Sequence, residues 1–416
     1  MNFDDTPQEA AYRARVREWI AAHAPDFGSL PPEQNRLWHP VHKDMARQWQ
    51  QTKAAAGYAC ISWPKERGGA GGSAIEEAIF SQEELAAGVQ FHYFATGLRM
   101  LLPALMEHTT DPASLAQVAP AVRGDTIWCQ LFSEPSSGSD SAGIRTRAQR
   151  DPGSQSGAGG GDWIVTGQKV WNSGAQASDY GMVVTRTDPD VPKHKGLTVF
   201  WLDMKSPGVE VRPIRMMSGD YEFNEVFLTD VRIPDNQRVG EVNGGWKVII
   251  STLMNERVAV GSVTGINWRD ILKLARETPS FDGMASQDPA FREWLADYYT
   301  EVEAIRLLSF RTMTALSRGE APSPAASAGK LLWANSTQAM TARALDLLES
   351  FGQIDDPDLA HRNGTFHHRF LWSPGLRLGG GSDEIMKNII AERVLGLPGD
   401  PRVDKDVPFR DIPSGR

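Results

Sequence analysis

The first 124 residues carry apolar side chains at helical spacing, interrupted by turn residues. Two stretches, TPQE at 6–9 and SAIE at 73–76, have the sequence of capping boxes, and the first also places a proline in the opening turn. A helix is therefore expected after each box, and the second should run into residue 88. Further helices are expected over about 41–56, 97–107 and 112–122.

The pattern changes after Gly124 to short runs rich in β-branched and aromatic residues, separated by turn residues. These runs are TIWCQLFS, DWIVTGQKVWNS, GMVVTRT, GLTVFWLDM, GVEVRPI and NEVFLTDVRI. They predict a compact, antiparallel, barrel-like β domain. Within it, the low-complexity segment 151–162 is expected to be the flexible tip of a hairpin.

Helical spacing returns after residue 245 and continues to about residue 396. Helices are expected over about 246–277, 288–318, 326–351 and 383–395. Separate all-helix and all-strand blocks predict an α+β protein in the order α, β, α, rather than a doubly wound sheet. The predicted parts are an N-terminal helical domain (1–124), a β domain (125–240), a C-terminal helical domain (241–398) and a polar tail (399–416). The tail is expected either to strap onto a neighbour or to stay loose.

Composition narrows the classes of function. The chain has 416 residues, a net charge of -9 and no run of Lys and Arg, so nucleic-acid binding is not expected. No apolar run approaches the roughly 20 residues of a membrane span, and the polar N-terminus predicts no signal peptide. The two cysteines, Cys60 and Cys129, indicate no disulfide framework, and a cytoplasmic location is expected.

Several common sites are missing from the sequence. There is no G-x-G-x-x-G after a strand and no P-loop lysine. The histidine pairs at 39/42 and 367/368 lack the spacing and the neighbouring carboxylates of a metal site, so no metal is expected. The stretch GSDSAG at 138–143 lacks the first glycine of a nucleophile elbow, which argues against a serine hydrolase.

Three segments carry candidate chemistry, each with a plainer alternative. QLFSEPSSGSD at 130–140 offers hydroxyls and free amides that can bind a polar ring or a phosphate, or it is an ordinary polar loop. GQKVWNSG at 167–174 places Trp171 and the hydroxyl of Ser173 on one strand face, which suits a flat heterocycle, or they are a core tryptophan and a turn serine. GGGSDEIMKN at 379–388 opens a helix whose free N–H groups can hold an anion, or it is a plain helix start.

Taken together and in this order, the segments resemble the motifs of the FAD-dependent acyl-CoA dehydrogenase family. QLFSEPSSGSDSAGIRT is similar to its first flavin motif, GQKVWNSGAQASDYG to its second, and GGGSDEIMKNIIAERVLGLP to its last. The resemblance covers about residues 5–398. It implies an N-terminal helical domain, a β-barrel-like domain and a C-terminal four-helix bundle, with FAD held between domains and across a dimer interface.

The resemblance also implies roles for individual residues. Ser133 matches the position that contacts the flavin pyrimidine edge, Trp171 flanks the flavin, and Ser173 bonds to N5, where the family more often has threonine. Glu384 stands where the family has glutamine, so it brings a negative charge towards the cofactor phosphates. The implied cofactor contacts are Gln130, Phe132, Ser133, Trp171, Ser173, Ser382 and Glu384, and the implied contacts with the CoA substrate are Ser139 and Arg257.

The reaction that the resemblance implies is α,β-dehydrogenation of an acyl-CoA, in which a carboxylate removes the α-proton and the β-hydride passes to flavin N5. Such a base must lie in a desolvated pocket that raises its pKa. Many family members keep this glutamate in the last motif, where Gly380 stands here, and glycine cannot accept a proton. Others place it on the first C-terminal helix, where Glu256 stands. Glu256 is therefore the expected base, and a surface glutamate is the alternative.

Two further departures concern the cofactor and the assembly. The family's Arg-x-x-Phe-Gly segment is replaced by LARETPSFDG at 274–283, and its glycine-rich segment by SFGQIDDPD at 350–358. The resemblance implies a homodimer or homotetramer, or pairing with an unlike subunit, and an electron-transfer flavoprotein as the electron acceptor. Alternatives to a competent dehydrogenase are a non-catalytic partner subunit and an acyl-CoA oxidase on the same fold.

Overall fold

The computed structural model describes residues 4–30, 38–89, 93–154, 161–260, 267–280, 282–318, 326–354, 356 and 358–413, without the side chains of 256–260, 313, 316, 317 and 326. The chain divides into two compact units. The first contains Met1–Arg215, Asp220–Asn255 and Asp400–Arg416, and the second contains Met216–Gly219 and Glu256–Gly399. The division falls inside helix α7 (Gly245–Val260).

The N-terminal part of the first unit is helical, as predicted. Both capping boxes are present, at Thr6 before α1 and at Ser73 before α3. In each box, a side-chain oxygen at the N-cap and a glutamate three residues later satisfy helix-start amides that would otherwise lack partners. The helices are α1 (Pro7–His23), α2 (Pro40–Ala55), α3 (Ala74–Ala86), a π-helix (Gly97–Leu101), α4 (Leu102–His108), α5 (Pro112–Leu115) and α6 (Val118–Val122).

The middle of the chain forms one eight-stranded sheet with the order β6-β7-β3-β2-β4-β5-β8, in which β1 also pairs with β4. The strands are β1 (Trp128–Leu131), β2 (Arg147–Arg150), β3 (Trp163–Lys169), β4 (Tyr180–Arg186), β5 (Leu197–Asp203), β6 (Val209–Pro213), β7 (Asn224–Ile233) and β8 (Arg238–Val239). The sheet is mixed rather than purely antiparallel, because β1 runs parallel to β4 with Leu131 opposite Val183. Within the described residues its path ends at β6 and β8, so the sheet is open rather than closed into a barrel.

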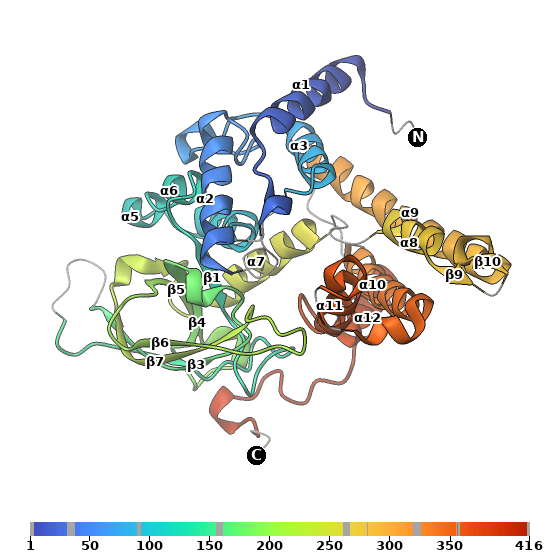
Figure 1. Ribbon diagram of the computed structural model, residues 1–416. Coiled ribbons are helices and arrows are strands. Elements are labelled where there is room, and N and C mark those ends of the chain that lie inside the picture. The colour runs from blue at the N-terminus through green and yellow to red at the C-terminus, as the bar shows by residue number, and fades with distance from the viewer. Residues whose placement is uncertain are drawn as a thin grey trace. The chain divides into compact units, whose positions relative to one another are not determined.

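The strands β4 and β5 separate two apolar cores, because successive side chains of a strand point to opposite faces. Met182 and Val199 face the N-terminal helices and join a cluster with Leu101. Val183 and Phe200 face the other way and pack with residues of β3 and β7. Figure 1 shows β3, β6 and β7 as a layer beyond β4 and β5, so the inner strands are covered on both sides.

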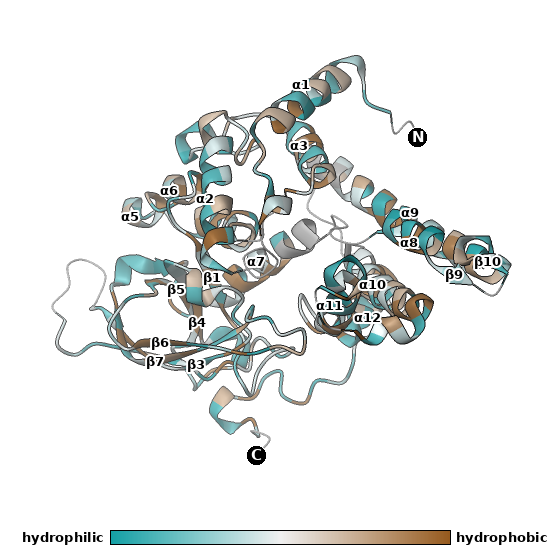
Figure 2. Cartoon of the chain, viewed as in Figure 1, coloured by the Kyte–Doolittle hydropathy of each residue, from teal (hydrophilic) through white to brown (hydrophobic). Residues whose placement is uncertain are grey.

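The second unit is helical. Its helices are α8 (Trp268–Glu277), α9 (Pro289–Ser317), α10 (Ala326–Leu348), α11 (Thr365–Trp372), α12 (Asp383–Ile389) and a π-helix (Ile390–Val394), with a small hairpin of β9 (Pro279–Ser280) and β10 (Gly283–Met284). Figure 2 shows alternating hydrophilic and hydrophobic bands along α9 and α10, as expected for helices with one buried face. Phe291, Met340 and Phe366 form the centre of their core.

The prediction of one helix over 246–277 is wrong. Asn267 is the N-cap of α8, and its side chain accepts a hydrogen bond from the amide of Arg269 at 2.9 Å. A capping box with Asp270 completes this helix start. Capping side chains of this kind satisfy the free amides of a new helix, so α7 and α8 are separate elements.

Part of the C-terminal tail packs against the chain itself rather than staying loose. Phe409 is 6% exposed, and residues 408–410 lie against the connection between β4 and β5 in the same unit. Among the described residues, no helix is both long and apolar enough to cross a membrane.

Candidate functional site

A buried ion pair fixes the start of the loop that follows β1. The Oε1 atom of Glu134 lies 2.8 Å from Nζ of Lys169, and both side chains are almost fully buried. The same carboxylate accepts hydrogen bonds from the amides of Arg145 and Thr146, at 2.7 and 2.9 Å. Nζ of Lys169 also donates to the carbonyl of Phe132 at 3.1 Å. The first motif is therefore held at both ends by groups that water does not reach.

Burial and pairing act in opposite directions on the carboxylate of this pair. Burial raises the pKa of Glu134, but the charge and hydrogen bonds of Lys169 and the hydrogen bonds at Thr146 and Arg145 outweigh it, so the pKa lies below its usual value. Burial lowers the pKa of Lys169 to about 8, and the charge of Glu134 limits that fall. Both groups are therefore charged near neutral pH.

The second motif is joined directly to the first. The amide of Val170 donates to the carbonyl of Ser133 at 3.0 Å. The side-chain amide of Asn172 donates to the carbonyl of Gln130 at 2.8 Å. Because these bonds lie on either side of Trp171, the structure brings Gln130, Phe132, Ser133 and Trp171 together, four of the residues for which the resemblance implies cofactor contacts.

Trp171 has an unusual backbone and an unusual exposure. Its φ is 63°, a region that large non-glycine residues rarely adopt, and its side chain is 59% exposed. The ring makes an edge contact with Phe223, with centroids 5.9 Å apart. The amide of Asn172 donates to the carbonyl of Asn224 at 3.1 Å, and the side chain of Asn224 donates back at 2.8 Å. These bonds hold the turn that presents the indole to its surroundings.

Ser173 completes this turn, and its hydroxyl makes no hydrogen bond to other described residues. Gly174 follows with a φ of 67°, and a Cβ atom there would lie 2.1 Å from the ring of Trp38. Glycine is therefore required, both for the backbone conformation and for the close approach of the tryptophan. The hydroxyl of Ser173 is left beside Trp171 as a potential donor.

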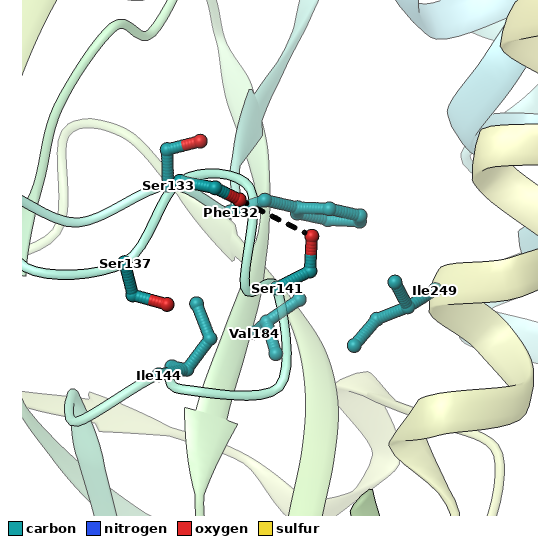
Figure 3. A pocket seen from close by; sticks show the side chains of 8 residues that line it. Phe132, Ser133, Ser137, Ser141, Ile144, Val184 and Ile249 are labelled. Carbon is teal, nitrogen blue, oxygen red and sulfur yellow. Dashed lines mark hydrogen bonds between the residues drawn. The ribbon is translucent and has the colours of Figure 1, made fainter. Parts of the chain in front are cut away.

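A small hollow lies next to the first motif, between the loop and helix α7. Figure 3 shows Ile249 reaching from α7 towards Val184, with Phe132 and Ser141 above them. The hydroxyl of Ser141 donates to the carbonyl of Gly138 at 3.4 Å. The predicted CoA contact Ser139 lies on the exposed side of the same loop. The lining residues are Phe132, Ser133, Ser137, Gly138, Ser141, Ile144, Val184 and Ile249.

The third motif belongs to the second unit. Ser382 is the N-cap of α12, as predicted, and accepts a hydrogen bond from the amide of Ile385 at 3.3 Å. Glu384 is exposed, and hydrogen bonds from its own amide and from Ser382 hold its pKa below the usual value. Asp383, which was not anticipated, is buried and pairs with Arg377 at 2.7 Å.

The predicted base and its neighbour fall partly outside the described residues. The backbone of Glu256 and Arg257 belongs to helix α7. Their side chains lie outside the part of the chain that the structure describes. Their assignment therefore stays a prediction.

Sequence reasoning missed the groups that hold the site. The burial of Lys169 could have been predicted from the sequence, because it lies an even number of residues after Trp163 and Val165, which are buried on the inner face of β3. An inward lysine in a strand requires a partner, and Glu134 is that partner. Asn172 and Asn224 gave no such signal, since their contacts join distant segments of the chain.

Models of three protein domains match the chain. The acyl-CoA dehydrogenase N-terminal, middle and C-terminal domains match residues 6–124, 129–231 and 243–395. Together they span almost the whole chain in the order in which its helical, sheet and helical parts occur.

Individual relatives agree with these matches. Acyl-CoA dehydrogenase FadE34 of Mycobacterium tuberculosis is 36% identical over 388 residues, covering 92% of this chain and 49% of that protein, so the chain spans about half of its length. Acyl-CoA dehydrogenase IpdE1 of Mycolicibacterium smegmatis is 35% identical over 402 residues, covering 93% of this chain and 97% of that protein. A solved structure described as "Tcur3481-Tcur3483 steroid ACAD" has a TM-score of 0.79 and 26% identity, covering 96% of this chain and 100% of that one.

Proposed function

The chain belongs to the acyl-CoA dehydrogenase family, and from this premise we propose that it desaturates an acyl-CoA thioester between the α and β carbons with Glu256 as the base. The observation that carries the proposal is the junction of the two flavin motifs in the first unit. Hydrogen bonds between residues 130–133 and 170–172 hold an exposed indole near the hydroxyls of Ser133 and Ser173, which make no hydrogen bond to other described residues. A flat, polar-edged ring fits such a surface.

Members of this family are FAD-dependent flavoproteins, and the residues of the first unit fit that cofactor. Trp171 offers a broad aromatic face, while Ser133 and Ser173 offer hydroxyl donors. Oδ1 of Asn172 is buried without a partner among the described residues, which adds an unfilled acceptor beside them. Bound FAD supplies a hydride acceptor at its N5 atom. The protein's own task is to orient the thioester, exclude water and remove the α-proton.

Glu256 is proposed as the base because the last motif lacks the family's usual carboxylate and helix α7 carries one. Gly380, at the position of the usual carboxylate, has a φ of 68°, a conformation that suits glycine and strains a side-chain-bearing residue. Both the missing carboxyl group and the backbone there argue against a base in the last motif. Glu256 supplies a carboxylate on α7, the helix that also contributes Ile249 to the hollow beside the first motif.

The test compares Glu256→Gln with Glu241→Gln, an exposed glutamate just before α7. Glu256→Gln should keep the flavin absorbance near that of the wild type and slow anaerobic flavin reduction by an acyl-CoA at least about 100-fold, because general-base removal costs that much. Glu241→Gln should reduce at the wild-type rate. Retained reduction in Glu256→Gln would exclude this glutamate as the base.

The same assay can identify the substrate class. A structural neighbour is described as a steroid ACAD, so we include steroid-derived thioesters among the candidate acyl groups. Anaerobic bleaching with straight-chain, branched, cyclic and steroid-derived acyl-CoAs ranks them by the rate of flavin reduction. An electron-transfer flavoprotein is the proposed acceptor of the electrons, and its reduction completes the turnover assay.

A second candidate function is that of one subunit in an assembly of two unlike chains. The neighbour described above is named as a pair, Tcur3481-Tcur3483, and the segments at 274–283 and 350–358 depart from the family pattern. Purifying this chain alone distinguishes the two possibilities. A yellow, active homodimer or homotetramer supports the first candidate, whereas colourless protein that regains flavin only with a second chain supports the other.

A further inference from the structure

The C-terminal segment 404–412 docks onto the connection between β4 and β5. The amides of Phe409 and Arg410 donate to the carbonyls of Val191 and Pro189, at 2.9 and 3.0 Å. A β-bridge joins neighbouring prolines of the two segments. This segment lies beyond residue 395, where the match to the C-terminal family domain ends.

Phe409 is the anchor of the segment. Its side chain is buried, and its ring centroid lies 3.8 Å from the guanidinium carbon of Arg186 and 5.1 Å from that of Arg145. Cations within about 6 Å of an aromatic face are attracted to it, and the attraction grows when water is excluded. Phe409 therefore covers and stabilises the buried charge of Arg186.

Arg186 in turn holds the far end of the loop that carries Ser139. Its Nη2 donates to the carbonyl of Ala142 at 2.6 Å and its Nε to that of Ile144 at 3.3 Å. Its Nη1 donates to the carbonyl of Lys193 at 2.6 Å. One planar guanidinium thus ties the loop and the docking surface of the tail to strand β4.

A second link joins the loop to the tail through Lys193, on the connection between β4 and β5. Nζ of Lys193 lies 2.9 Å from a carboxylate oxygen of Asp140 and 2.7 Å from one of Asp404. Asp140 follows Ser139 in the loop, and Asp404 lies in the tail. The tail therefore reaches the loop by two routes, one through a buried ring and cation and one through a partly exposed ion pair.

We propose that Phe409 is a positioning residue for the acyl-CoA substrate, and that through Arg186 it holds loop 137–144 in the shape that binds the CoA moiety. The inference rests on the proposed function in one respect, namely that Ser139 and its loop contact CoA. The loop contributes four residues to the hollow beside the first motif, so a change in its shape alters that surface.

The experiment compares Phe409→Ala, Phe409→Leu and the control Val403→Ala in the full-length flavoprotein. Val403 is 92% exposed and lies just before the segment. Phe409→Ala should raise the Kd for coenzyme A, measured by calorimetry, roughly tenfold, which corresponds to about 1.4 kcal/mol. The flavin content per chain should not change. Phe409→Leu keeps apolar bulk but lacks the ring face, so it should give a smaller rise and also serves if the alanine variant does not fold.

Hydrogen–deuterium exchange separates the failure of this inference from the failure of the proposed function. Phe409→Ala or Phe409→Leu should increase uptake in peptides covering 137–144, while the β6–β7 hairpin stays unchanged. Unchanged uptake in the loop, or an equal effect of Val403→Ala, would overturn the role of Phe409. Increased uptake with no change in Kd for coenzyme A would also overturn it. If Ser139→Ala in addition left that Kd unchanged, the proposed CoA role of the loop would be wrong.

Discussion

Lys169 and Arg186 are both buried cations that hold the loop between β1 and β2, but their partners differ. Lys169, at the start of the loop, pairs with the carboxylate of Glu134 at 2.8 Å. Arg186, near the end of the loop, places its three side-chain hydrogen bonds on main-chain carbonyls within the described residues, under the ring of Phe409. Burial lowers the pKa of both, to about 8 for Lys169 and about 10 for Arg186.

The difference follows from the shapes of the two charged groups. An ammonium is a compact charge that needs a nearby anion when it is buried, whereas a guanidinium spreads its charge over a plane with five donors and an aromatic-binding face. The start of the loop is thus held by a pair that fails if either member is lost. The charge of Arg186, by contrast, is met by several neutral partners, one of which, the ring of Phe409, belongs to the C-terminal tail. We therefore expect substitutions at the start of the loop to lower the free energy of unfolding more than substitutions at its end.

The largest effect is expected from Glu134→Gln. The substitution leaves Lys169 buried without its anion, which typically costs about 3–5 kcal/mol of unfolding free energy. The loop start should loosen, and the flavin should dissociate more readily from the first motif. Denaturant unfolding and flavin release on dilution measure the two consequences.

Two comparisons sharpen this result. The double substitution Glu134→Gln with Lys169→Met removes both charges and should recover part of the lost stability, because no unpaired charge remains. The pKa of Glu134 is lowered in the folded state, so its contribution is fully present above the ordinary carboxyl pKa of 4.5 and is lost as the pH falls below it. The gap between wild type and Glu134→Gln should therefore stay constant from pH 7 down to about pH 4.5 and shrink as the pH falls further. A gap independent of pH would argue that the carboxylate charge is unimportant.

A smaller effect is expected from Arg186→Lys. Lysine keeps the charge but cannot reach three carbonyls in one plane, so at least one of them loses its donor, and we expect a loss of about 1–3 kcal/mol. Arg212→Lys, on the exposed strand β6, is the matched control and should change unfolding by less than about 0.5 kcal/mol. Equal stability of Arg186→Lys and wild type would contradict the role assigned to the guanidinium plane.

These two cations also show what the sequence could and could not reveal. The capping boxes at Thr6 and Ser73 and the N-cap at Ser382 were predicted correctly, because a cap depends on residues three positions apart. The approach of Ser133 to Trp171 was also expected, but only through the family resemblance. By contrast, no local pattern pairs Arg186 with Phe409, since that contact depends on how the tail returns to the sheet.

The same dependence on distant contacts and on local caps explains where the predicted strand directions and the predicted helix over 246–277 differ from the structure. The antiparallel expectation holds for most strand pairs but not for β1 and β2 beside β4, because alternation within a strand reports which face is buried, and not which strand lies beside it. The expected single helix over 246–277 is two helices because Asn267 caps a new helix start, which apolar spacing alone does not reveal. The domain boundaries and the role of Glu256 stay predictions, since they rest on the sequence and the resemblance.

The smallest effect is expected from Asp404→Asn, which removes one of the two links between tail and loop. The carboxylate of Asp404 is one-third exposed and Lys193 keeps Asp140 as a partner, so solvent and the remaining anion compensate for most of the loss. The Kd for coenzyme A should rise less than twofold at low salt and match the wild type at 0.5 M salt, where such pairs are screened. A rise as large as that of Phe409→Ala would mean that the ion pair, and not the buried ring, holds the tail to the loop. Lys193 would then join Lys169 and Arg186 as a cation that holds the loop.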